Sequence, residues 1–391
     1  MSVSFHDARQ VAWEIGSEHS RRHEVLPLRA VMGRTLAEPV HALTSVPATD
    51  TSAMDGWAVE GEGPWRIDGS VRMGAVPSRA LPRGTGRAIT TGGAMPLGTT
   101  TVLRSERGRA VEDLVVAGDG SSALRAFTDV RRAGEEVLAG DVVAATGTRM
   151  TPAVAAAIAT SGSDEVWVVR SPRVALVLLG DEVIQEGVPL PGQVRDALGV
   201  SVPEVLRGVG MDVTSVTYAT DDASAVRRAL SQEGVDVVIS TGGTGHGHGD
   251  HLVPALLRLN AEVLVRGVSM RPGHPTVLAH REDGVPVLGL PGNPFAGLVA
   301  LIALGLPLLA GLVGSPPPPM LRRVAARPIG GPPSGARLVA VSECAEGIVP
   351  VERQGAAMTC GLVHADSIAV IETPWIDEGA SARTLSLPWS R

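Results

Sequence analysis

A glycine-rich segment, STGGTGHGHGD over residues 240–250, has the composition of an anion-binding turn. It follows the apolar run GVDVVI, which predicts a buried strand, and a helix is predicted over 250–260. Gly242 and Gly243 adopt positive φ readily, so backbone N–H groups can approach a phosphate there, and the start of the next helix adds partial positive charge. The spacing matches neither common phosphate-loop motif, so a plain connecting loop remains the alternative.

Two kinds of metal chemistry are open to this segment. His246, His248 and His251 have nitrogen ligands that suit a transition metal, with solvated loop histidines as the alternative. Asp250 would lie beside bound phosphates, where a carboxylate is repelled unless a cation such as Mg²⁺ lies between them. The same aspartate could cap the helix that follows, and it could fill both roles.

A second turn, GLPGNPFAG over 289–297, also follows an apolar strand and opens a helix. Pro291 and Pro294 fix the backbone φ, and Gly292 permits a tight turn. Asn293 can hydrogen-bond to the backbone or to a ligand. A structural turn needs no ligand, but two such turns at strand ends in one α/β domain favour a binding site.

Two further clusters carry acids. TSAMDGWAV at 51–59 places Asp55 in an Asp-Gly turn between β-like runs, and RRAGEEV at 131–137 places Glu136 close to two arginines. An ordinary turn and a solvated charged turn are the structural alternatives.

Composition narrows the function further. The 391 residues are 44% apolar and 19% charged, with a net charge of −7, which indicates a folded chain without a general nucleic-acid or anionic-membrane surface. No lysine occurs, so an anion site must use arginine, histidine or backbone N–H groups. Two distant cysteines, Cys344 and Cys360, predict neither a disulfide framework nor a zinc site and suit the cytoplasm.

The predicted elements fall into blocks that position these clusters. Helices are expected within 5–40, short strands from 45 to about 130, and a helix at 151–161 with Thr151 as its N-cap. From 172 onward, apolar runs alternate with helical segments, beginning with PRVALVLLG, and this alternation predicts a mostly parallel sheet covered by helices. A proline-rich linker at 314–320 precedes a C-terminal β region.

One apolar segment has two interpretations. FAGLVALIALGLPLLAGLVG at 295–314 is long enough to span a bilayer and has no charged residue. It contains several glycines and a proline, and no Trp or Tyr flanks it. A helix buried within the protein is the favoured interpretation.

Taken in order along the chain, five segments resemble the molybdopterin molybdenumtransferase family, which includes the MoeA proteins and the gephyrin E-domain. The segments are SAMDGWAV, RRAGEEVLAGDVV, RVALVLLGDEV, STGGTGHGHGD and GLPGNPFAG. The resemblance implies a multidomain α/β plus β fold. It divides the chain into a discontinuous helical and mixed N-terminal domain (1–44 plus 132–168), an all-β insert (45–131), a MogA-like three-layer α/β domain with a mostly parallel sheet (169–314) and a C-terminal β domain (315–391).

The resemblance also implies an activity, namely the insertion of molybdate into adenylylated molybdopterin with release of AMP, assisted by Mg²⁺. It implies a homodimer with the site at the subunit interface, and molybdopterin adenylyltransferase as an upstream partner. The catalytic acids carried over are Asp55, Glu136, Asp222 and Asp250, of which Asp55, Asp222 and Asp250 would bind the cation. The residues carried over for binding substrate are Gly242, Gly243, Asp181, Glu182, Asp196, Arg271, His274, Pro291, Gly292, Asn293 and Pro294.

Several positions depart from the family pattern. Arg271 and His274 stand where the family has lysines, and Ala296 replaces a serine. Arginine keeps the positive charge, whereas histidine keeps it only when protonated. Two alternatives to the transferase therefore stay open. One is a diverged paralogue that binds pterin without efficient molybdenum insertion, and the other is a non-catalytic dimeric scaffold.

Overall fold

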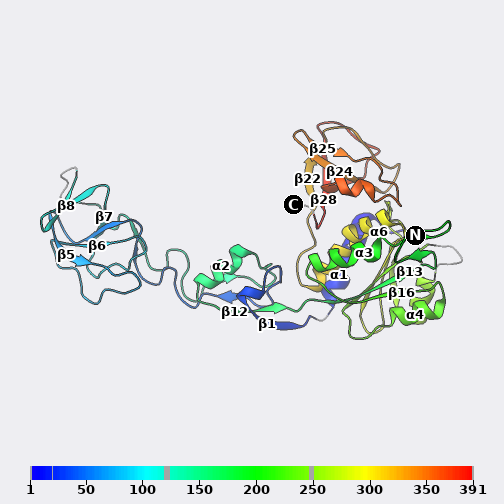
Figure 1. Cartoon of the computed structure of the whole chain (residues 1–391), viewed down its shortest axis with the longest axis horizontal. Helices are drawn as coiled ribbons and strands as arrows, with labels where there is room; N and C mark the ends of the chain where they lie inside the picture. Colours follow the sequence, from blue (N-terminus) through cyan, green and yellow to red (C-terminus); the bar gives the residue numbers. More distant parts are fainter. Residues whose placement is uncertain (1, 20, 119–123, 246–250, 390–391) are drawn as a thin grey trace.

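The chain is elongated, with its domains arranged one after another (Figure 1). The computed structural model describes residues 2–19, 21–118, 124–245 and 251–389. A β-rich domain lies at one end, and a small mixed domain lies in the middle. The α/β domain and the C-terminal domain lie together at the other end.

The inserted domain contains a six-stranded sheet. In spatial order its strands are β7 (Thr101–Arg104), β4 (Gly56–Val59), β6 (Thr85–Ile89), β5 (Trp65–Ser70), β9 (Leu114–Ala117) and β8 (Gly108–Val111). Trp65 is fully buried and packs with Val59 and Leu103 in the core. Because β4 lies between β6 and β7, the Asp-Gly turn that precedes it lies at the end of an interior strand of the sheet.

Short antiparallel strand pairs and one helix form the middle domain. The pairs are β1 (His23–Pro27) with β12 (Glu165–Val169), β2 (Val40–His41) with β11 (Val142–Ala144), and β3 (Thr51–Ser52) with β10 (Val130–Arg131). Helix α2 (Pro152–Thr160) begins as predicted, because Thr151 Oγ1 accepts a hydrogen bond from the N–H of Val154. The chain enters and leaves the inserted domain at β3 and β10.

A second six-stranded sheet is the centre of the α/β domain. In spatial order its strands are β16 (Asp212–Ala219), β13 (Arg173–Leu179), β17 (Val237–Thr241), β21 (Pro286–Leu290), β20 (Val277–His280) and β18 (Glu262–Arg266). β13, β16, β17 and β21 are parallel, whereas β20 runs antiparallel to both of its neighbours, β21 and β18. The apolar run that predicts a buried parallel strand is β13, whose residues 174–179 are all buried.

Helices cover both faces of this sheet, which makes three layers. α3 (Leu198–Gly208) and α6 (Pro294–Ala300) pack on one face, and α4 (Ala223–Leu230) and α5 (Leu252–Arg258) pack on the other. Alternate side chains of β13 enter the two cores, with Leu176 in the first and Val177 in the second. The predicted multidomain fold, with its mostly parallel three-layer domain and flanking β domains, is confirmed.

The apolar segment at 295–314 is a core helix. It consists of α6, a π-helical segment η2 (Leu301–Gly305) and α7 (Leu306–Leu312). Its length and composition would allow it to cross a membrane, but 94% of its most apolar window is buried inside the protein. The interpretation as a buried helix is therefore confirmed.

The first helix, α1 (Phe5–Glu18), packs along α7 at close range. A Cβ on Gly16 would lie 2.1 Å from the carbonyl oxygen of Leu308, so only glycine permits this approach. Phe5 and Ile15 enter the same core as the α/β sheet. The packing of α1 thus differs from the predicted division, which placed residues 1–44 together in the mixed domain.

Arg9 on α1 donates a hydrogen bond to a buried carbonyl of the core helix. In an α-helix the carbonyl of Ala303 would accept from the residue four positions later, which is Pro307 and has no N–H. Arg9 Nη1 donates to that carbonyl at 2.6 Å, and Nη2 donates to the carbonyl of Pro318 in the proline-rich linker at 2.9 Å. Burial lowers the pKa of Arg9 to about 10.

The C-terminal domain is a β domain, as predicted. Its strands are β22 (Leu321–Val324), β23 (Ile329–Gly330), β24 (Ala336–Cys344), β25 (Gly347–Pro350), β26 (Ser367–Ile371), β27 (Trp375–Ile376) and β28 (Ser381–Ser386), with a short helix η3 (Cys360–His364). A strand from the α/β domain, β19 (Met270–Arg271), pairs in parallel with β24. The two domains therefore share one sheet.

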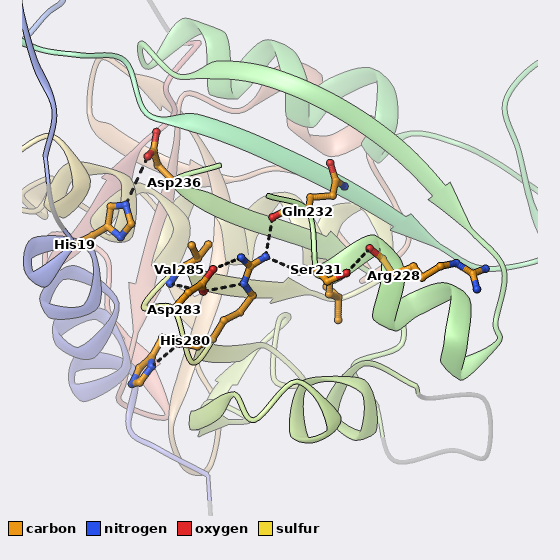
Figure 2. Close-up of polar contacts among 10 residues, drawn as sticks. His19, Arg228, Ser231, Gln232, Asp236, His280, Asp283 and Val285 are labelled. Atoms are coloured by element: carbon orange, nitrogen blue, oxygen red, sulfur yellow. Dashed lines mark hydrogen bonds and ion pairs between the residues drawn. The ribbon is translucent and has the colours of Figure 1, made fainter. Parts of the chain in front are cut away.

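An ion pair links the end of α1 to the α/β sheet (Figure 2). His19 Nε2 lies 3.6 Å from Asp236 Oδ1, and Asp236 Oδ2 accepts a hydrogen bond from the N–H of Arg173 at 2.7 Å. Partial burial alone would raise the pKa of Asp236, but the hydrogen bonds from His19 and Arg173 outweigh it and lower the pKa. Asp236 thus fixes the start of β13 against α1.

Replacing Arg9 with methionine tests the role of its two hydrogen bonds. Arg9→Met removes both hydrogen bonds, including the one to the buried carbonyl of Ala303, so we expect the free energy of unfolding to fall by about 2 kcal/mol. Urea denaturation followed by circular dichroism measures the change. Arg322→Met, at an exposed position on β22, is the matched control and should change little. Equal stability of the two variants would contradict this role for Arg9.

Candidate functional site

Two glycine turns lie side by side at the carboxyl ends of β17 and β21. The last residues of these two strands, Thr241 and Leu290, are paired in the sheet, and the N–H of Gly242 donates to the carbonyl of Leu290 at 3.0 Å. A Cβ on Gly292 would lie only 3.3 Å from the Cα of Gly242. Gly242 has a φ of +82°, and a Cβ there would lie 2.8 Å from the carbonyl oxygen of Leu179. The turns thus form a cup walled by backbone atoms.

A cleft of about 820 Å³ opens at this cup. The predicted binding residues that line it are Glu182, Asp196, Gly242, Gly243, Pro291, Gly292, Asn293 and Pro294. The C-terminal domain supplies Ala357 and Thr359, and the N–H of Ala296 donates to the carbonyl of Ala356 at 3.0 Å. The cleft therefore lies between the α/β domain and the C-terminal domain.

Acidic groups gather on one side of the cleft. The N–H of Asp221 donates to Asp181 Oδ1 at 3.2 Å, and the N–H of Asp181 donates to Asp221 Oδ2 at 3.4 Å. Burial raises the pKa of Asp221, and the charges of Asp181 and Glu182 raise it further against the opposing effects of the Asp181 N–H and of His251. A cation beside Asp221 would offset both the cost of burying its negative charge and the repulsion from the neighbouring carboxylates.

Asp222, the predicted catalytic acid, is the N-cap of α4. Its carboxylate accepts hydrogen bonds from the N–H groups of Ser224 and Ala225, at 3.1 Å and 2.8 Å, and from the hydroxyl of Ser224. These hydrogen bonds lower its pKa. The neighbouring Asp221, rather than Asp222, lines the cleft.

Asp196 lies at the cleft but is already paired within the protein. It is buried, its Oδ1 accepts from the N–H of Gly199 at 2.8 Å, and its Oδ2 accepts from the hydroxyl of Tyr218 at 2.7 Å. Burial and the bond to Asp196 raise the pKa of Tyr218 to about 12. A Cβ on Gly199 would lie 2.0 Å from Asp196, so glycine is required there. Asp196 thus shapes the cleft wall.

The two predicted cationic ligands lie elsewhere. Arg271 belongs to β19 and is drawn into the C-terminal sheet opposite Arg337. His274 Nδ1 lies 2.7 Å from the carbonyl oxygen of Val268, which turns the ring back onto its own loop. Neither residue is among those that line the cleft, whereas the adjacent Pro275 is.

Asp55 and Glu136 lie in two neighbouring segments that do not line the cleft. The pairing of Thr51 with Arg131 brings the two segments together where the inserted domain begins. Asp55 Oδ1 accepts from the N–H and the hydroxyl of Thr91, at 2.7 Å and 2.9 Å, and these bonds lower its pKa. Glu136 is exposed. Figure 1 shows the inserted domain at the opposite end of the chain from the α/β domain.

Part of the predicted metal chemistry lies outside the described residues. This applies to Asp250, His246 and His248. His251 is half-buried and precedes α5, where its side chain makes no capping hydrogen bond. Within the described part of this chain, no three His, Cys, Asp or Glu side chains form a group with metal-binding geometry.

Several cleft residues were not among the predicted site residues, including Asp221, Arg195 and Thr359. Asp221 lies two residues after the end of β16, and the pair Asp221-Asp222 does signal a strand end followed by a helix start. Asp222 caps α4, whereas Asp221 lines the cleft. Thr359 gives no comparable signal, since it arrives from another domain.

Together the fold and the cleft define a multidomain protein whose three-layer α/β domain carries a ligand cleft at the carboxyl ends of parallel strands. Comparison with known proteins assigns the family. Residues 3–162 match the family model described as the MoeA N-terminal region (domain I and II), and residues 175–311 match the probable molybdopterin binding domain.

Relatives agree with these matches. Molybdopterin molybdenumtransferases of Nostoc sp. and Bacillus subtilis are both 32% identical to this chain, and the matches cover 74% and 73% of this chain and 70% of each relative. A crystal structure of the molybdopterin biosynthesis MoeA protein from Pyrococcus horikoshii, at 24% identity, superposes with a TM-score of 0.79 over 99% of both chains. The chain belongs to the molybdopterin molybdenumtransferase family.

The close approach of the two turns predicts that Gly242→Ala will disrupt the cup. A methyl group there combines a φ of +82° with a clash against Leu179, and we expect a loss of about 2–3 kcal/mol together with loss of AMP binding. Gly284 has nearly the same φ, +80°, with nothing within 4 Å of its Cβ. Gly284→Ala should therefore cost only about 1 kcal/mol and keep AMP binding. Urea unfolding and calorimetric titration measure both effects, and equal losses would contradict the clash.

The raised pKa of Asp221 predicts a pH-dependent gain in stability for Asp221→Asn. A raised folded-state pKa means that native stability is greatest when Asp221 is protonated and is lost as the pH rises through that pKa. The variant should therefore have the higher Tm at pH 7, and the difference should shrink as the pH falls. Thermal denaturation at pH 7 and pH 5 tests this.

With Mg²⁺ and AMP present, the wild type should gain Tm while Asp221→Asn should not. Asp222→Asn is the paired variant, because asparagine preserves the helix cap. If Asp222→Asn, and not Asp221→Asn, removed the Mg²⁺-dependent gain, the cation site would belong to Asp222.

Proposed function

We propose that this chain catalyses the last step of molybdenum cofactor assembly. It would accept adenylylated molybdopterin and molybdate, hydrolyse the diphosphate bridge with water as the attacking oxygen, bind the metal to the two dithiolene sulfurs while oxygen leaves molybdate as water, and release AMP and the metal-loaded cofactor. The observation that supports this most directly is the pair of glycine turns in contact at the carboxyl ends of β17 and β21, with acidic side chains beside them. Backbone N–H groups in such turns bind phosphate without requiring lysine.

Each part of the cleft has a distinct task in this proposal. The turns that contain Gly242 and Gly292 bind the diphosphate. The Asn293 turn and the Thr359 segment of the C-terminal domain enclose the pterin end and limit access of water. The buried Asp196 keeps this wall rigid through Tyr218 and Gly199.

The acids beside the cup fit a Mg²⁺ ion. Magnesium is usually held in proteins by one or two carboxylates together with substrate phosphates. Asp221 and Glu182 both line the cleft and offer two such carboxylates, and burial together with the neighbouring charges of Asp181 and Glu182 raises the pKa of Asp221. When bound, the ion would neutralise charge on the diphosphate.

Asp55 would reach the cleft of a second copy of the chain. Its own α/β domain lies at the other end of the molecule in Figure 1, so we propose a head-to-tail homodimer in which each inserted domain faces the partner's cleft. The hydrogen bonds from Thr91 keep Asp55 ionised and fixed, which suits it to hold a cation or to orient water. A cytoplasmic location, and a molybdopterin adenylyltransferase that supplies the substrate, complete the proposal.

Release of AMP from adenylylated molybdopterin tests the reaction. Purified protein with molybdate and Mg²⁺ should release one AMP per substrate molecule, and Asp221→Asn should lower the rate at least about tenfold, as is typical for the loss of a metal or acid–base ligand. Binding of pterin without AMP release would instead support the diverged paralogue. Absence of both would support the scaffold.

Tagged heterodimers test the shared site. A dimer of one Asp55→Asn chain and one Asp221→Asn chain keeps one intact cleft if the site is shared, so we expect about half of the wild-type activity per dimer. The matched control is a dimer of a doubly substituted chain with a wild-type chain, which should be inactive. If each site lay within one chain, these two results would be exchanged.

A further inference from the structure

The cleft has an unbalanced charge that one residue partly offsets. Its described lining carries the acids Glu182, Asp196 and Asp221 and a single basic side chain, Arg195. The substrates of the proposed reaction, a diphosphate and an oxyanion, are themselves strongly negative. Among the described lining residues, Arg195 is therefore the positively charged side chain that can bind them.

Backbone hydrogen bonds hold the main chain of Arg195 in place, whereas its guanidinium forms no ion pair with a described acid. It ends β15 (Val194–Arg195), which pairs in parallel with β14 (Val183–Ile184). On either side of it, the N–H of Val194 donates to the carbonyl of Glu182 and the N–H of Asp196 donates to the carbonyl of Ile184, both at 2.9 Å. These bonds fix the position of the Arg195 Cα at the cleft.

The guanidinium itself has one weak partner. Nη1 donates to the carbonyl of Ile184 at 3.2 Å, and no acid in the described residues forms an ion pair with it. The adjacent Asp196 forms no ion pair with it, and the two oxygens of that carboxylate accept hydrogen bonds from the N–H of Gly199 and the hydroxyl of Tyr218. Since the side chain is exposed, its remaining N–H donors can turn to a ligand at little cost.

The other candidate cations do not line the cleft. Arg271 lies on β19, whose backbone pairs with β24, and His274 Nδ1 lies 2.7 Å from the carbonyl oxygen of Val268. The chain has no lysine. Among the described residues that line the cleft, Arg195 is therefore the one basic side chain.

We propose that Arg195 is the anion-binding cation of this cleft, and that it takes a tetrahedral oxyanion, either a phosphate of the adenylylated substrate or molybdate. Arginine suits this task because its planar fork donates two parallel hydrogen bonds to such a group and keeps its charge at every physiological pH. The assignment of these two ligands rests on the proposed function, whereas the assignment of Arg195 as the oxyanion contact rests on the cleft alone.

Calorimetric titrations of AMP and of molybdate, each into wild type and variants, separate the two sources. Arg195→Gln should raise the Kd of one of these ligands about ten- to a hundredfold, the loss expected for a charge-assisted hydrogen bond. Arg195→Lys, which keeps the charge but not the fork, should fall between the two proteins. An effect on AMP alone would identify a phosphate contact, and an effect on molybdate alone would identify the oxyanion end.

Arg207→Gln is the matched control. Arg207 is exposed in the last turn of α3, pairs with Glu204 and does not line the cleft, so its loss should leave both Kd values unchanged. Equal binding by wild type and Arg195→Gln, or equal weakening by Arg207→Gln, would overturn the assignment. So would a loss confined to Arg271→Gln.

The same titrations distinguish failure of this assignment from failure of the proposed reaction. Wild type that releases no AMP from adenylylated molybdopterin, yet binds AMP in an Arg195-dependent way, would reject the reaction and keep the assignment. Wild type that turns over normally while Arg195→Gln binds and reacts equally well would keep the reaction and reject the assignment.

Discussion

The contact between Gly242 and Gly292 is the constraint on which the site depends. It exists because β17 and β21 are parallel neighbours, so the chain leaves both strands at the same edge of the sheet. Any side chain on Gly242 would strike the carbonyl of Leu179 on β13, the strand on the other side of β17. Three parallel strands therefore meet at one backbone-walled cup, and the helices that follow the turns need only cover the sheet.

Electrostatics around the cup follow from which groups are already paired. The carboxylate of Asp222 accepts hydrogen bonds from N–H groups of α4, and the carboxylate of Asp196 accepts hydrogen bonds from Tyr218 and Gly199. Asp221 is partly buried, faces like charges and has a raised pKa, so it is the acid that gains most from a bound cation. Arg195 is the corresponding basic group, because its charge has no acidic partner in the described chain. Charged side chains that are already hydrogen-bonded within the fold are thus distinguished from those that can still bind a ligand. This distinction identifies candidate functional groups better than residue type alone does.

Much of this could be predicted from the sequence, since it depends on local pattern. The buried strand β13, the N-cap at Thr151 and the apolar core helix all follow from periodicity and capping preferences that act over a few residues. What could not be predicted depends on contacts between distant segments. The approach of Gly16 to Leu308, the capture of Arg271 by β24 and the arrival of Thr359 at the cleft join segments that no local pattern relates. The position of Asp221 at the cleft was not predicted either, because a one-residue shift decides which of the two carboxylates caps the helix.

The elongated shape of the chain separates the inserted domain, which carries Asp55, from the α/β domain (Figure 1). Asp55 lies at the start of an interior strand, where its Oδ1 accepts two hydrogen bonds from Thr91, and no hydrogen bond joins it to a described residue of the α/β domain. Because the side chain is exposed and these two bonds are both made to Oδ1, Oδ2 remains open to a ligand outside the inserted domain. In the proposed dimer, the cleft of one chain supplies phosphate contacts and one cation-binding carboxylate, and the second copy supplies another. Each half alone would then bind substrate without completing the cation site, which makes assembly of the dimer a requirement for the reaction rather than for folding.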